Sequence, residues 1–463
     1  MKFKRVALVL PFIDEEFVKL RRLFDPDWYH PLNLLSIATY LKKYSPEIEI
    51  LLLDEQVDSD LDILNSITNF KPDILGITPS YFAQKTSLQL AKLGKSLGSK
   101  IVLGGAFATK MGKIMMQIPE VDYLITEDGE EAMLELVSGK PLDQIPNLTW
   151  RANGEIRTNM IKLLDLNHLP LIDYNLCKLE RYFQNFTKVK MLNEREFQEN
   201  PYNRPLTFYC QKGCRWRDKT GGCTFCACMY KTWRGRNPKT VCRDIIDCQE
   251  KYGIDSLSFQ EDDFLAQGWW FDEFYRELIS YEKHPGIEYI YARADSLNED
   301  QIVKLDKLGC YQVYIGIESG SPKSQRSIHK GVSTKKTLEV VKLLSEYNIL
   351  TKASFVIGVR GETQETLNET LKFCEELTKR GKVSVHAYPL LPTPGSADWN
   401  RAIKEIPDFR SAFQDKPLLD VNKMLKLWNE NYSKVNLDTI EKTCSELVSL
   451  GISNHWNAYQ DKL

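Results

Sequence analysis

Short apolar runs alternate with amphipathic segments along the first 150 residues of the chain. A short apolar run that ends at a polar or turn-forming residue predicts a buried strand, whereas apolar positions that recur with helical spacing predict a helix. The runs that predict strands are 6–10, 48–53, 74–78, 101–103 and 123–126, and the segments that predict helices are 33–43 and 86–97. Continuous apolar strands between helices are typical of a parallel sheet covered on both faces.

The residues that follow these strands are expected to contact a ligand, because ligands of open parallel sheets lie beyond the carboxyl ends of the strands. The chain places Ser80, Gly104, Gly105 and the turn at 127–130 in those positions. Glycine at such an edge allows the backbone to approach a bulky ligand closely. Glycine also commonly does no more than end a strand, and both interpretations stay open at this point.

A second series of strands and helices begins at Leu206. Strands are expected near 206–210, 256–260, 287–292, 311–317, 353–357 and 383–388, and helices near 238–252, 271–282, 298–308, 334–347 and 364–379. Six repeats are fewer than a closed eight-stranded barrel needs, so the pattern predicts a curved partial barrel with its chemistry at the carboxyl ends of the strands. The residues after 400 are mostly helical by pattern.

Composition narrows the class of protein. The 463 residues include 43% hydrophobic side chains, which is enough for two or three domain cores. The net charge is −2 with Lys and Arg spread along the chain, so no basic stripe for nucleic acid is expected. No apolar stretch approaches the ~20 residues that span a bilayer, and the N-terminal segment lacks the pattern of a signal peptide. Eleven cysteines then indicate a reducing, cytoplasmic setting and no disulfide framework.

Cysteines are concentrated between Leu206 and Asn237, where the chain has Cys210, Cys214, Cys223, Cys226 and Cys228. Cys223 and Cys226 enclose two residues, and Cys214 precedes them in a loop rich in Gly and Arg. Three thiolates can hold a [4Fe–4S] cluster and leave its fourth iron open for another ligand. We therefore predict that Cys214, Cys223 and Cys226 are cluster ligands.

Two alternatives use the same cysteines. A Cys-x-x-Cys pair followed by two later cysteines is also typical of a structural zinc site, and Cys242 and Cys248 do follow. These two lie in a predicted helix that opens with Asn237-Pro238, a favourable N-cap and first helical residue. The second alternative is that Cys210 or Cys228 replaces Cys214 as a cluster ligand.

Polar and small residues end the strands of the second series. The five segments are Gln260–Asp263, Arg293–Asp295, Gly316–Ser321, Gly358–Glu362 and Pro389–Gly395. Any one of them could be a helix cap or a surface turn. Because the carboxyl ends of parallel strands meet at one edge of a sheet, the five together predict a single cleft.

The second half of the chain resembles the radical S-adenosylmethionine (SAM) superfamily, specifically its cobalamin-linked branch. The resemblance rests on Lys212-Gly-Cys214 followed by Cys223-Thr-Phe-Cys226, on Asp262-Asp263 and on Gly316-Ile-Glu-Ser-Gly320. The eight residues from Arg215 to Gly222 depart from the usual three between the first two cysteines, and similar insertions occur in maturases of ribosomally made peptides.

The first half resembles the cobalamin-binding domain that precedes many radical SAM enzymes. The matching pieces are His30-Pro-Leu-Asn-Leu34, Lys71-Pro-Asp-Ile-Leu-Gly-Ile77, Leu103-Gly-Gly-Ala106 and the segment 121–130. The Asp-x-His-x-x-Gly motif, with which some cobalamin proteins place a histidine on cobalt, is missing after the first strand. His30 and His168 are the only histidines before the cysteine loop, and each is expected to make an ordinary polar contact.

The two resemblances together imply a fold, a division of the chain and three cofactors. The fold is α/β, with a Rossmann-like cobalamin-binding domain at 1–150, a connector at 151–205, a partial (β/α)6 radical SAM barrel at 206–400 and a helical C-terminal extension at 401–463. The cofactors are a [4Fe–4S] cluster, SAM and cobalamin. The residues implied for SAM are Phe225, Asp262, Arg293, Glu318, Ser319 and Gly358. Those implied for cobalamin are Ser80, Tyr81, Gly104, Gly105, Ala106, Glu127 and Gly129.

The reaction that the resemblance implies is methylation of an unactivated carbon through a 5′-deoxyadenosyl radical and methylcobalamin. One alternative keeps these cofactors and performs a rearrangement, cyclisation or reduction without methyl transfer. An alternative of another class is a zinc-stabilised corrinoid-binding module without catalysis. The expected partners are an unidentified peptide or small-molecule substrate and an electron donor such as flavodoxin or ferredoxin, with neither nucleic acid nor a membrane span.

Overall fold

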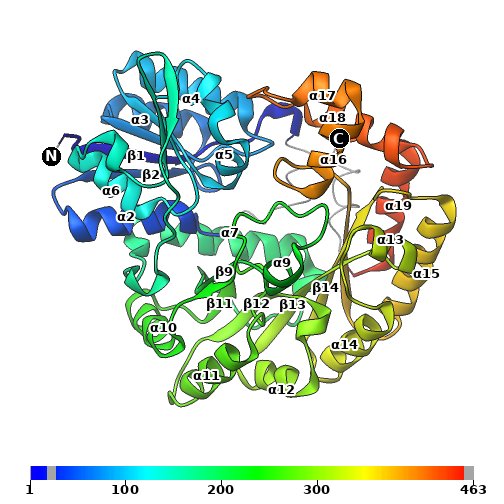
Figure 1. Cartoon of the computed structure of the whole chain (residues 1–463). Coiled ribbons are helices and arrows are strands. Elements are labelled where there is room, and N and C mark those ends of the chain that lie inside the picture. The colour runs from blue at the N-terminus through cyan, green and yellow to red at the C-terminus, as the bar shows by residue number, and fades with distance from the viewer. Residues whose placement is uncertain (1, 18–27, 453–463) are drawn as a thin grey trace. The chain divides into compact units, whose positions relative to one another are not determined.

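The computed structural model describes residues 2–17 and 28–452, and its elements are labelled in Figure 1. The chain forms two compact units. The first comprises residues 1–184 and 412–421, and the second comprises residues 185–411 and 422–463. Within the described residues, no helix has the length and apolar character that crossing a membrane requires. The predicted functional boundaries at residues 150, 205 and 400 stay predictions.

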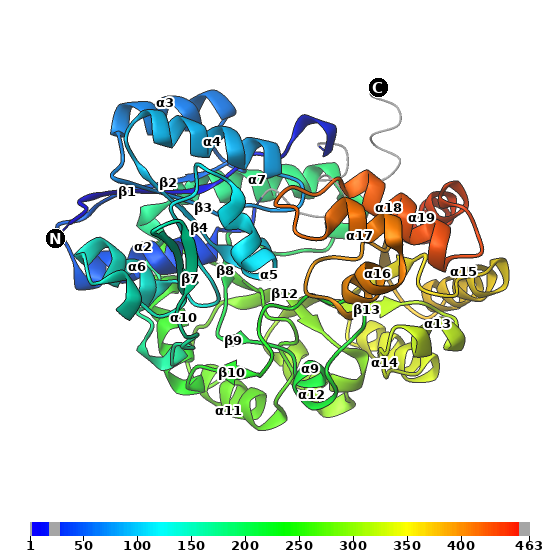
Figure 2. The same cartoon turned by 45° about the horizontal axis from the view of Figure 1, so that its top comes forward.

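The first unit contains a seven-stranded sheet in the order β2-β1-β3-β4-β5-β6-β7. The parallel strands are β1 (Arg5–Leu10), β2 (Glu49–Asp54), β3 (Ile74–Ile77), β4 (Lys100–Leu103) and β5 (Tyr123–Ile125). Five helices connect or follow them: α2 (Leu32–Tyr44), α3 (Asp60–Phe70), α4 (Gln84–Ser96), α5 (Gly105–Met111) and α6 (Glu130–Ser138). Helices α3 and α4 cover one face and α2 and α6 the other (Figures 1 and 2). This confirms the predicted Rossmann-like half.

Two further strands extend this sheet, and the sequence reasoning did not predict them. Strands β6 (Leu148–Ala152) and β7 (Glu155–Thr158) form an antiparallel hairpin that pairs with β5. Asn153 and Gly154 connect them with φ angles of 55° and 83°, as a type I′ turn requires. The Asn-Gly pair is a strong hairpin signal, so this element was predictable in principle.

Residues 412–421 also belong to the first unit, although they follow the barrel in sequence. The side-chain amide of Gln84 holds this segment, because it donates to the Leu419 carbonyl at 2.9 Å and accepts the Leu419 N–H at 2.7 Å. The same amide also donates to the Tyr81 carbonyl at 2.9 Å. A buried amide with these partners fixes the segment on α4.

The second unit contains a six-stranded parallel sheet in the order β15-β14-β13-β12-β11-β8. The strands are β8 (Pro205–Phe208), β11 (Ser256–Phe259), β12 (Gly286–Ala292), β13 (Cys310–Glu318), β14 (Leu350–Ile357) and β15 (Val383–Pro389). The helices between them are α10 (Pro238–Tyr252), α11 (Gly268–Leu278), α12 (Glu299–Lys307), α13 (Pro322–Ser327), α14 (Thr334–Glu346) and α15 (Gln364–Thr378). The sheet ends at β8 and β15 without closing, which confirms the predicted partial barrel.

The two faces of the barrel strands differ in polarity. On β13, Val313, Ile315 and Ile317 are buried apolar residues on one face. Gln312 and Tyr314 alternate with them and lie on the other face, which we call the inner face, since side chains of a strand point alternately to opposite sides. The inner face therefore carries polar side chains into the barrel.

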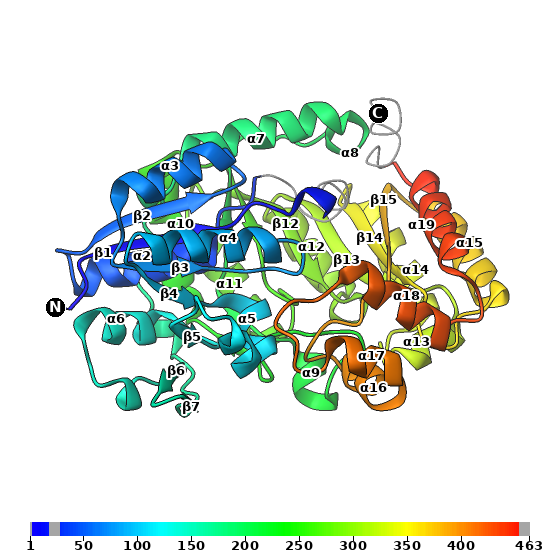
Figure 3. The same cartoon turned by 90° about the horizontal axis from the view of Figure 1, so that it is seen from above.

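The C-terminal extension is helical, as predicted. It contains α16 (Ala397–Glu405), α17 (Pro407–Phe413), α18 (Val421–Tyr432) and α19 (Leu437–Leu450). Helix α19 lies beside α15 in Figures 1 and 3. Just after α19, the Ile452 N–H donates to the Val383 carbonyl at 3.0 Å, so the extension covers the free edge of β15.

Candidate active site

The cysteine-rich loop lies between β8 and α10 at the carboxyl edge of the barrel sheet. Two short strands, β9 (Gln211–Lys212) and β10 (Arg234–Gly235), pair antiparallel and close its base. Gly213 directly precedes Cys214 with φ +88°, and a Cβ there would lie 2.3 Å from the Thr232 carbonyl oxygen. Only glycine fits at this position, so the entry of the chain into Cys214 is fixed by backbone packing.

The three predicted cluster thiols share one electrostatic environment. Cys214, Cys223 and Cys226 are half-buried, and the Cys228 N–H donates to the Cys226 Sγ at 3.3 Å. Burial raises the pKa of Cys223 to about 11, and it raises the pKa values of Cys214 and Cys226 as well. Metal ligation needs thiolates, so a bound iron ion has to supply the positive charge that offsets this burial.

Three cations already stand among these thiols. Arg293 interacts electrostatically with Cys214 and Cys223, and the ammonium of Lys330 interacts with Cys223 and Cys226. Arg217 also interacts with Cys226. In residues 2–17 and 28–452, no three His, Cys, Asp or Glu side chains are arranged to hold a single metal ion. Three soft sulfur donors from one loop, with a sulfur-directed N–H and three nearby cations, fit the requirements of an iron–sulfur cluster.

The cysteines of the zinc alternative are placed elsewhere. Cys242 and Cys248 are fully buried on α10, and the Cys242 thiol contacts the Phe274 carbonyl of α11 at 3.5 Å. Cys210 is also fully buried, and its backbone N–H and its thiol both contact the Glu261 carboxylate, at 2.6 Å and 3.2 Å. Each of these thiols therefore packs in the protein interior.

The eight-residue insertion forms helix α9 (Arg215–Thr220), which docks on the segment that follows α13. The Trp216 indole N–H donates to the His329 carbonyl at 2.9 Å, and the Arg293 guanidinium lies 4.8 Å from the centre of a Trp216 ring. A Cβ at Gly331 would lie 2.3 Å from the Trp216 ring. Glycine at 331 therefore leaves the space that this ring occupies.

The Cys223–Cys226 pair is held from two sides. The Thr224 N–H donates to the Ile328 carbonyl at 2.9 Å, and the Thr224 hydroxyl donates to the Asp398 carboxylate at 2.9 Å. The Asp398 N–H in turn donates to the Thr224 carbonyl at 3.0 Å. Helix α16 of the C-terminal extension thus helps to position the cysteine pair, a role that the sequence pattern of the extension did not indicate.

The two aspartates after β11 have different surroundings. Asp262 is exposed, and one of its oxygens accepts the Gly213 N–H at 3.2 Å and the Cys228 thiol at 3.2 Å. Asp263 is buried and accepts the Ser296 hydroxyl at 2.8 Å. Burial raises the pKa of Asp263 to about 6. The motif therefore provides one carboxylate beside the cysteine loop and one in the interior.

Glu318 and Lys330 form a buried ion pair at the end of β13. The ammonium and carboxylate lie 2.7 Å apart, and the two side chains are 8% and 7% exposed. Glu318 has φ 67° at a bulge between β13 and β14. A Cβ at Gly316 would lie 2.4 Å from the Glu318 carboxylate and 2.9 Å from the Lys330 ammonium. The Gly-x-Glu motif therefore makes room for the pair.

Lys330 is a site residue that the sequence reasoning missed. It lies twelve residues after Glu318, beyond α13, and its partner is apparent only in the folded chain. The one local signal is the Lys330-Gly331 pair after an Ile328-His329 step, in which His329 and Gly331 have positive φ angles. Such a turn between α13 and α14 indicates a fixed loop, but it does not identify the carboxylate that the lysine contacts.

Arg293 connects this pair to the next strand end. Its guanidinium forms two hydrogen bonds with the Asp295 carboxylate, at 2.9 Å and 3.1 Å, and one with the Lys330 carbonyl at 2.8 Å. Three of the residues predicted for SAM thus lie around the cysteine loop. Asp262 contacts Gly213 of the loop, and Arg293 and Glu318 both contact Lys330.

Of the other three residues predicted for SAM, two contact other elements of the second unit and one lies within the cysteine loop. The Ser319 hydroxyl hydrogen-bonds with Thr370 of α15 at 2.9 Å. Gly358 has φ +86°, and its carbonyl accepts the Trp428 indole N–H at 2.9 Å. Phe225 is half-buried within the cysteine pair. Ser319 and Gly358 therefore contact the protein itself through at least part of their polar groups.

The inner face of the barrel continues below this edge as a polar, aromatic lining. The rings of Tyr291 and Tyr314 lie 5.0 Å apart, and the Tyr388 hydroxyl lies 3.3 Å from the His386 Nδ1. Deeper in the barrel, the Glu288 carboxylate accepts hydrogen bonds from the Gln312 amide at 2.7 Å and from the Ser258 hydroxyl at 2.8 Å. Burial raises the pKa of Glu288 to about 7. The lining offers phenol, imidazole and carboxyl groups toward the barrel interior.

The carboxyl edge of the first unit is built mainly from backbone. Gly105 has φ +84°, and a Cβ there would lie 2.7 Å from the Thr78 methyl group. Glu127 has φ 58°, and its N–H donates to the Thr109 hydroxyl at 3.1 Å. Gly104 and Gly129 directly precede α5 and α6. All four residues belong to the set predicted for cobalamin.

The remaining members of that set lie at the same strand ends. The Tyr81 ring packs edge-on against Phe107 at 4.7 Å, and the Ser80 hydroxyl accepts the Phe82 N–H at 3.3 Å. Ala106 is exposed in the first turn of α5. The fold therefore brings the predicted residues to one edge, while their contacts with cobalamin stay predictions.

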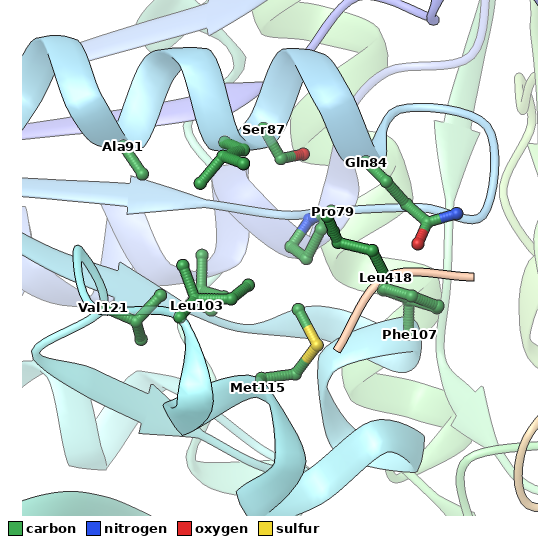
Figure 4. A pocket seen from close by; sticks show the side chains of 11 residues that line it. Pro79, Gln84, Ser87, Ala91, Leu103, Phe107, Met115, Val121 and Leu418 are labelled. Atoms are coloured by element: carbon green, nitrogen blue, oxygen red, sulfur yellow. The ribbon is translucent and has the colours of Figure 1, made fainter. Parts of the chain in front are cut away.

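An apolar pocket opens behind this edge (Figure 4). It is a shallow depression, because its empty space of about 320 Å³ includes open solvent. Its lining residues are Pro79, Gln84, Ser87, Leu88, Ala91, Leu103, Phe107, Met115, Ile118, Val121 and Leu418. Leu418 comes from the segment that Gln84 holds, so that segment forms one wall of the pocket.

The two histidines of the first unit have separate local roles. His30 is buried and stacked on Tyr182 with ring centres 4.6 Å apart, and burial lowers its pKa to about 3. His168 is exposed, with its Nε2 4.0 Å from Asp165. His30 is therefore neutral at physiological pH, and it belongs to an aromatic cluster.

Comparison with known proteins matches two families. Residues 26–137 match the B12 binding domain, and residues 208–374 match the radical SAM superfamily. The first range contains every residue predicted for cobalamin, and the second contains the cysteine loop and all six residues predicted for SAM. The family matches imply cobalamin, SAM and a [4Fe–4S] cluster as cofactors.

Two curated relatives differ in their reactions. An uncharacterized methyltransferase of Pyrococcus horikoshii is 26% identical over 425 residues, which cover 87% of this chain and 84% of the relative. The anaerobic magnesium-protoporphyrin IX monomethyl ester cyclase of Rubrivivax gelatinosus is 26% identical over 399 residues, which cover 80% of this chain and 66% of the cyclase.

Two solved structures share the fold. The cobalamin-dependent radical SAM enzyme OxsB, with aqua-cobalamin bound, superposes with a TM-score of 0.66 at 18% identity and covers 90% of this chain, which spans 57% of the length of OxsB. The methyltransferase TsrM from Kitasatospora setae, with cobalamin and a [4Fe–4S] cluster bound, gives 0.65 at 16% identity, with 87% and 75% covered. At these identities the structures show a common fold alone. The two family matches show that the chain carries an N-terminal B12 binding domain followed by a radical SAM domain.

Proposed function

We propose that this enzyme transfers a methyl group to an unactivated carbon of its substrate. The observation that carries the proposal is the presence, in one chain, of a three-cysteine loop at a barrel edge and a B12 binding domain. The relative from Pyrococcus horikoshii and the structural neighbour TsrM are both named methyltransferases, which supports methyl transfer over other radical reactions.

The chain's own residues would hold and orient the cofactors. Cys214, Cys223 and Cys226 ligate the cluster, which when bound supplies the electron that splits SAM into methionine and a 5′-deoxyadenosyl radical, while cobalamin supplies the methyl group. Arg293 and Glu318 stand beside the cysteine loop with opposite charges, and they suit the carboxylate and the polar hydroxyl or amino groups of SAM. Phe225, Asp262, Ser319 and Gly358 complete the proposed SAM site.

The first unit would bind cobalamin at its carboxyl edge. Ser80, Tyr81, Gly104, Gly105, Ala106, Glu127 and Gly129 are the proposed contacts. The positive φ of Gly105 and its lack of a side chain let the backbone approach a large flat ligand. The aromatic inner face of the barrel would receive the substrate and exclude water from the radical.

A second candidate function is cyclisation without methyl transfer, because a named cyclase aligns with 80% of this chain at the same identity as the methyltransferase. The substrate class is a peptide or a small molecule in either case. We also propose a cytoplasmic location, since all eleven cysteines are free thiols, and an electron donor such as flavodoxin or ferredoxin.

Anaerobic reconstitution with iron, sulfide, SAM and a reductant, with and without hydroxocobalamin, tests the proposal, because the reduced corrinoid can accept a methyl group from SAM. 5′-Deoxyadenosine should form, and S-adenosylhomocysteine should accumulate only when cobalamin is present. 5′-Deoxyadenosine without S-adenosylhomocysteine in the cobalamin-loaded enzyme would favour the cyclase-type reaction. Absence of both from enzyme with a full cluster would contradict both candidates. The Cys226→Ala variant should form neither product, whereas Cys242→Ala, a change within the buried face of α10, should form both.

A further inference from the structure

Strand β7 is the open edge of the first unit's sheet. In Figure 3 the strands follow one another from β2 to β7, and no strand of the described residues pairs with the outer side of β7. All four of its residues are exposed. It has no proline, and it pairs with β6 residue for residue without a bulge. Proline and bulges are two of the features with which natural edge strands prevent pairing with another chain, and β7 lacks both. Its protection against unspecific pairing is limited to its short length and its two charged side chains, Glu155 and Arg157.

The hairpin register shows which backbone groups of β7 are free. The paired residues are Ala152 with Glu155 and Trp150 with Arg157, with Arg151 and Thr149 opposite Ile156 and Thr158. In a two-residue hairpin the pair that flanks the turn exchanges both hydrogen bonds, and bonded pairs then alternate. Asn159 follows this alternation, because its N–H donates to the Leu148 carbonyl at 2.9 Å. The N–H and carbonyl groups of Ile156 and Thr158 therefore point away from β6.

The side chains of β7 are self-complementary about Ile156. Glu155 and Arg157 lie on the same face of the strand, one on each side of Ile156. Neither of them forms an ion pair with another residue in the described part of the chain. In an antiparallel pair centred on Ile156, each glutamate would lie directly opposite an arginine, at the closely spaced positions of the ladder.

We propose that β7 is an interface between two copies of this chain, paired antiparallel about Ile156. The symmetric arrangement satisfies the outward backbone groups of both Ile156 residues and forms two Glu155–Arg157 pairs at once, as an isologous contact requires. The Ile156 side chains of the two copies, each 39% exposed in the single chain, would also contact each other on the opposite face. The contact is independent of the catalytic proposal and short, so the dimer should dissociate on dilution.

Charge reversal gives the test. The oligomeric state of the full chain would be measured by sedimentation velocity over a range of concentrations, for the wild type, Arg157→Glu, Glu155→Arg and the double variant. Each single change puts like charges opposite each other at two places and should raise the dimer dissociation constant at least about tenfold. The double variant restores opposite charges and should recover dimerisation. Lys335→Glu, an exposed reversal in the second unit, should have no effect.

Recovery of dimerisation in the double variant distinguishes the loss of an interface from a folding defect. A merely misfolded single variant would not regain dimerisation when the second charge is reversed, and circular dichroism of all variants should match that of the wild type, because the residues are exposed. A wild-type chain that stays monomeric at every concentration would overturn the proposal. A dimer that tolerates Arg157→Glu unchanged would overturn it as well, since another surface would then hold the copies together.

Discussion

The carboxyl edge of the second unit's sheet carries a buried ion pair and an arginine beside the cysteine loop, whereas most of the residues predicted for cobalamin at the first unit's edge present backbone and apolar groups. In the second unit, the buried Lys330 forms an ion pair with Glu318, and its backbone carbonyl accepts a hydrogen bond from the buried Arg293. In the first unit, Gly105 and the apolar pocket define the edge. Parallel sheets position both edges alike, so the difference lies in the residues that end the strands.

The difference agrees with the ligands that the two family matches imply. A cluster of thiolates and a sulfonium nucleotide carry concentrated charge, which buried ion pairs and fixed N–H groups can orient. A corrinoid presents a broad, largely neutral face, for which close backbone approach and apolar space matter more. Loss of a charge should therefore strongly affect the carboxyl edge of the second unit's sheet. Addition of a methyl group should strongly affect ligand binding at the carboxyl edge of the first unit's sheet.

Removal of the Lys330 ammonium should have the largest effect on stability. Lys330→Met leaves the Glu318 carboxylate buried without its partner, and breaking such a pair typically costs about 3–5 kcal/mol. The free energy of unfolding of the cluster-free chain, from denaturant titration, measures this loss. The double variant Lys330→Met/Glu318→Gln should recover a large part of it. A loss below about 1 kcal/mol in the single variant would mean that the edge does not depend on this pair.

The buried carboxyl groups of the second unit should make its stability depend on pH. Burial raises the pKa of Glu288 from 4.5 to about 7, so its contribution is fully present below pH 4.5 and is lost as the pH rises through 7. The loss amounts to about 3 kcal/mol. Glu288→Gln should remove it, so the variant should gain stability relative to the wild type between pH 5 and pH 8. Parallel pH profiles of the two proteins, followed by thermal unfolding, would contradict this account.

A methyl group at Gly105 should weaken the first edge. Gly105→Ala places a Cβ 2.7 Å from the Thr78 methyl group at φ +84°. Gly98→Ala is the matched control, because Gly98 has φ +85° and no atom within 4 Å of the added Cβ. Both changes should cost about 1–2 kcal/mol through the backbone alone. Only Gly105→Ala should also reduce cobalamin binding, measured by absorbance titration. Equal cobalamin binding by the two variants would show that Gly105 does not belong to the cobalamin site.

The smallest expected effect concerns the insertion. Trp216→Phe keeps the ring over Arg293 but removes the hydrogen bond to the His329 carbonyl, which is worth about 1 kcal/mol. Hydrogen exchange of the amides in α9 should accelerate about fivefold while exchange in the first unit is unchanged. Unchanged exchange in α9 would show that the helix is held by its other contacts.

Much of the fold follows from local patterns. The helix predicted at 238–252 has the observed bounds of α10, because Asn237 caps its first turn and Gly253 ends it with φ 61°. The six barrel strands were predictable from apolar runs that end in polar residues. Helix α7 (Leu179–Leu192) was missed, since its segment was interpreted as part of a connector.

The parts of the site that the sequence did not reveal depend on contacts between distant residues. Asp398 meets Thr224 across 174 positions, and Lys330 meets Glu318 only after α13 has turned the chain back. No periodicity or spacing encodes such pairs, because each residue alone is an ordinary helix or loop residue. The cysteines proposed as cluster ligands could be singled out from the sequence because cluster chemistry imposes both the residue type and a short spacing.

We propose that Cys214, Cys223 and Cys226 hold the cluster of this enzyme. The most direct test of this proposal is the iron and acid-labile sulfide content of anaerobically reconstituted protein, with electron paramagnetic resonance of the reduced samples. Alanine at any of these three positions should abolish the intact cluster, whereas Cys228→Ala and Cys210→Ala should retain it. A full complement of iron and sulfide in Cys214→Ala, lost instead in Cys228→Ala or Cys210→Ala, would contradict the account.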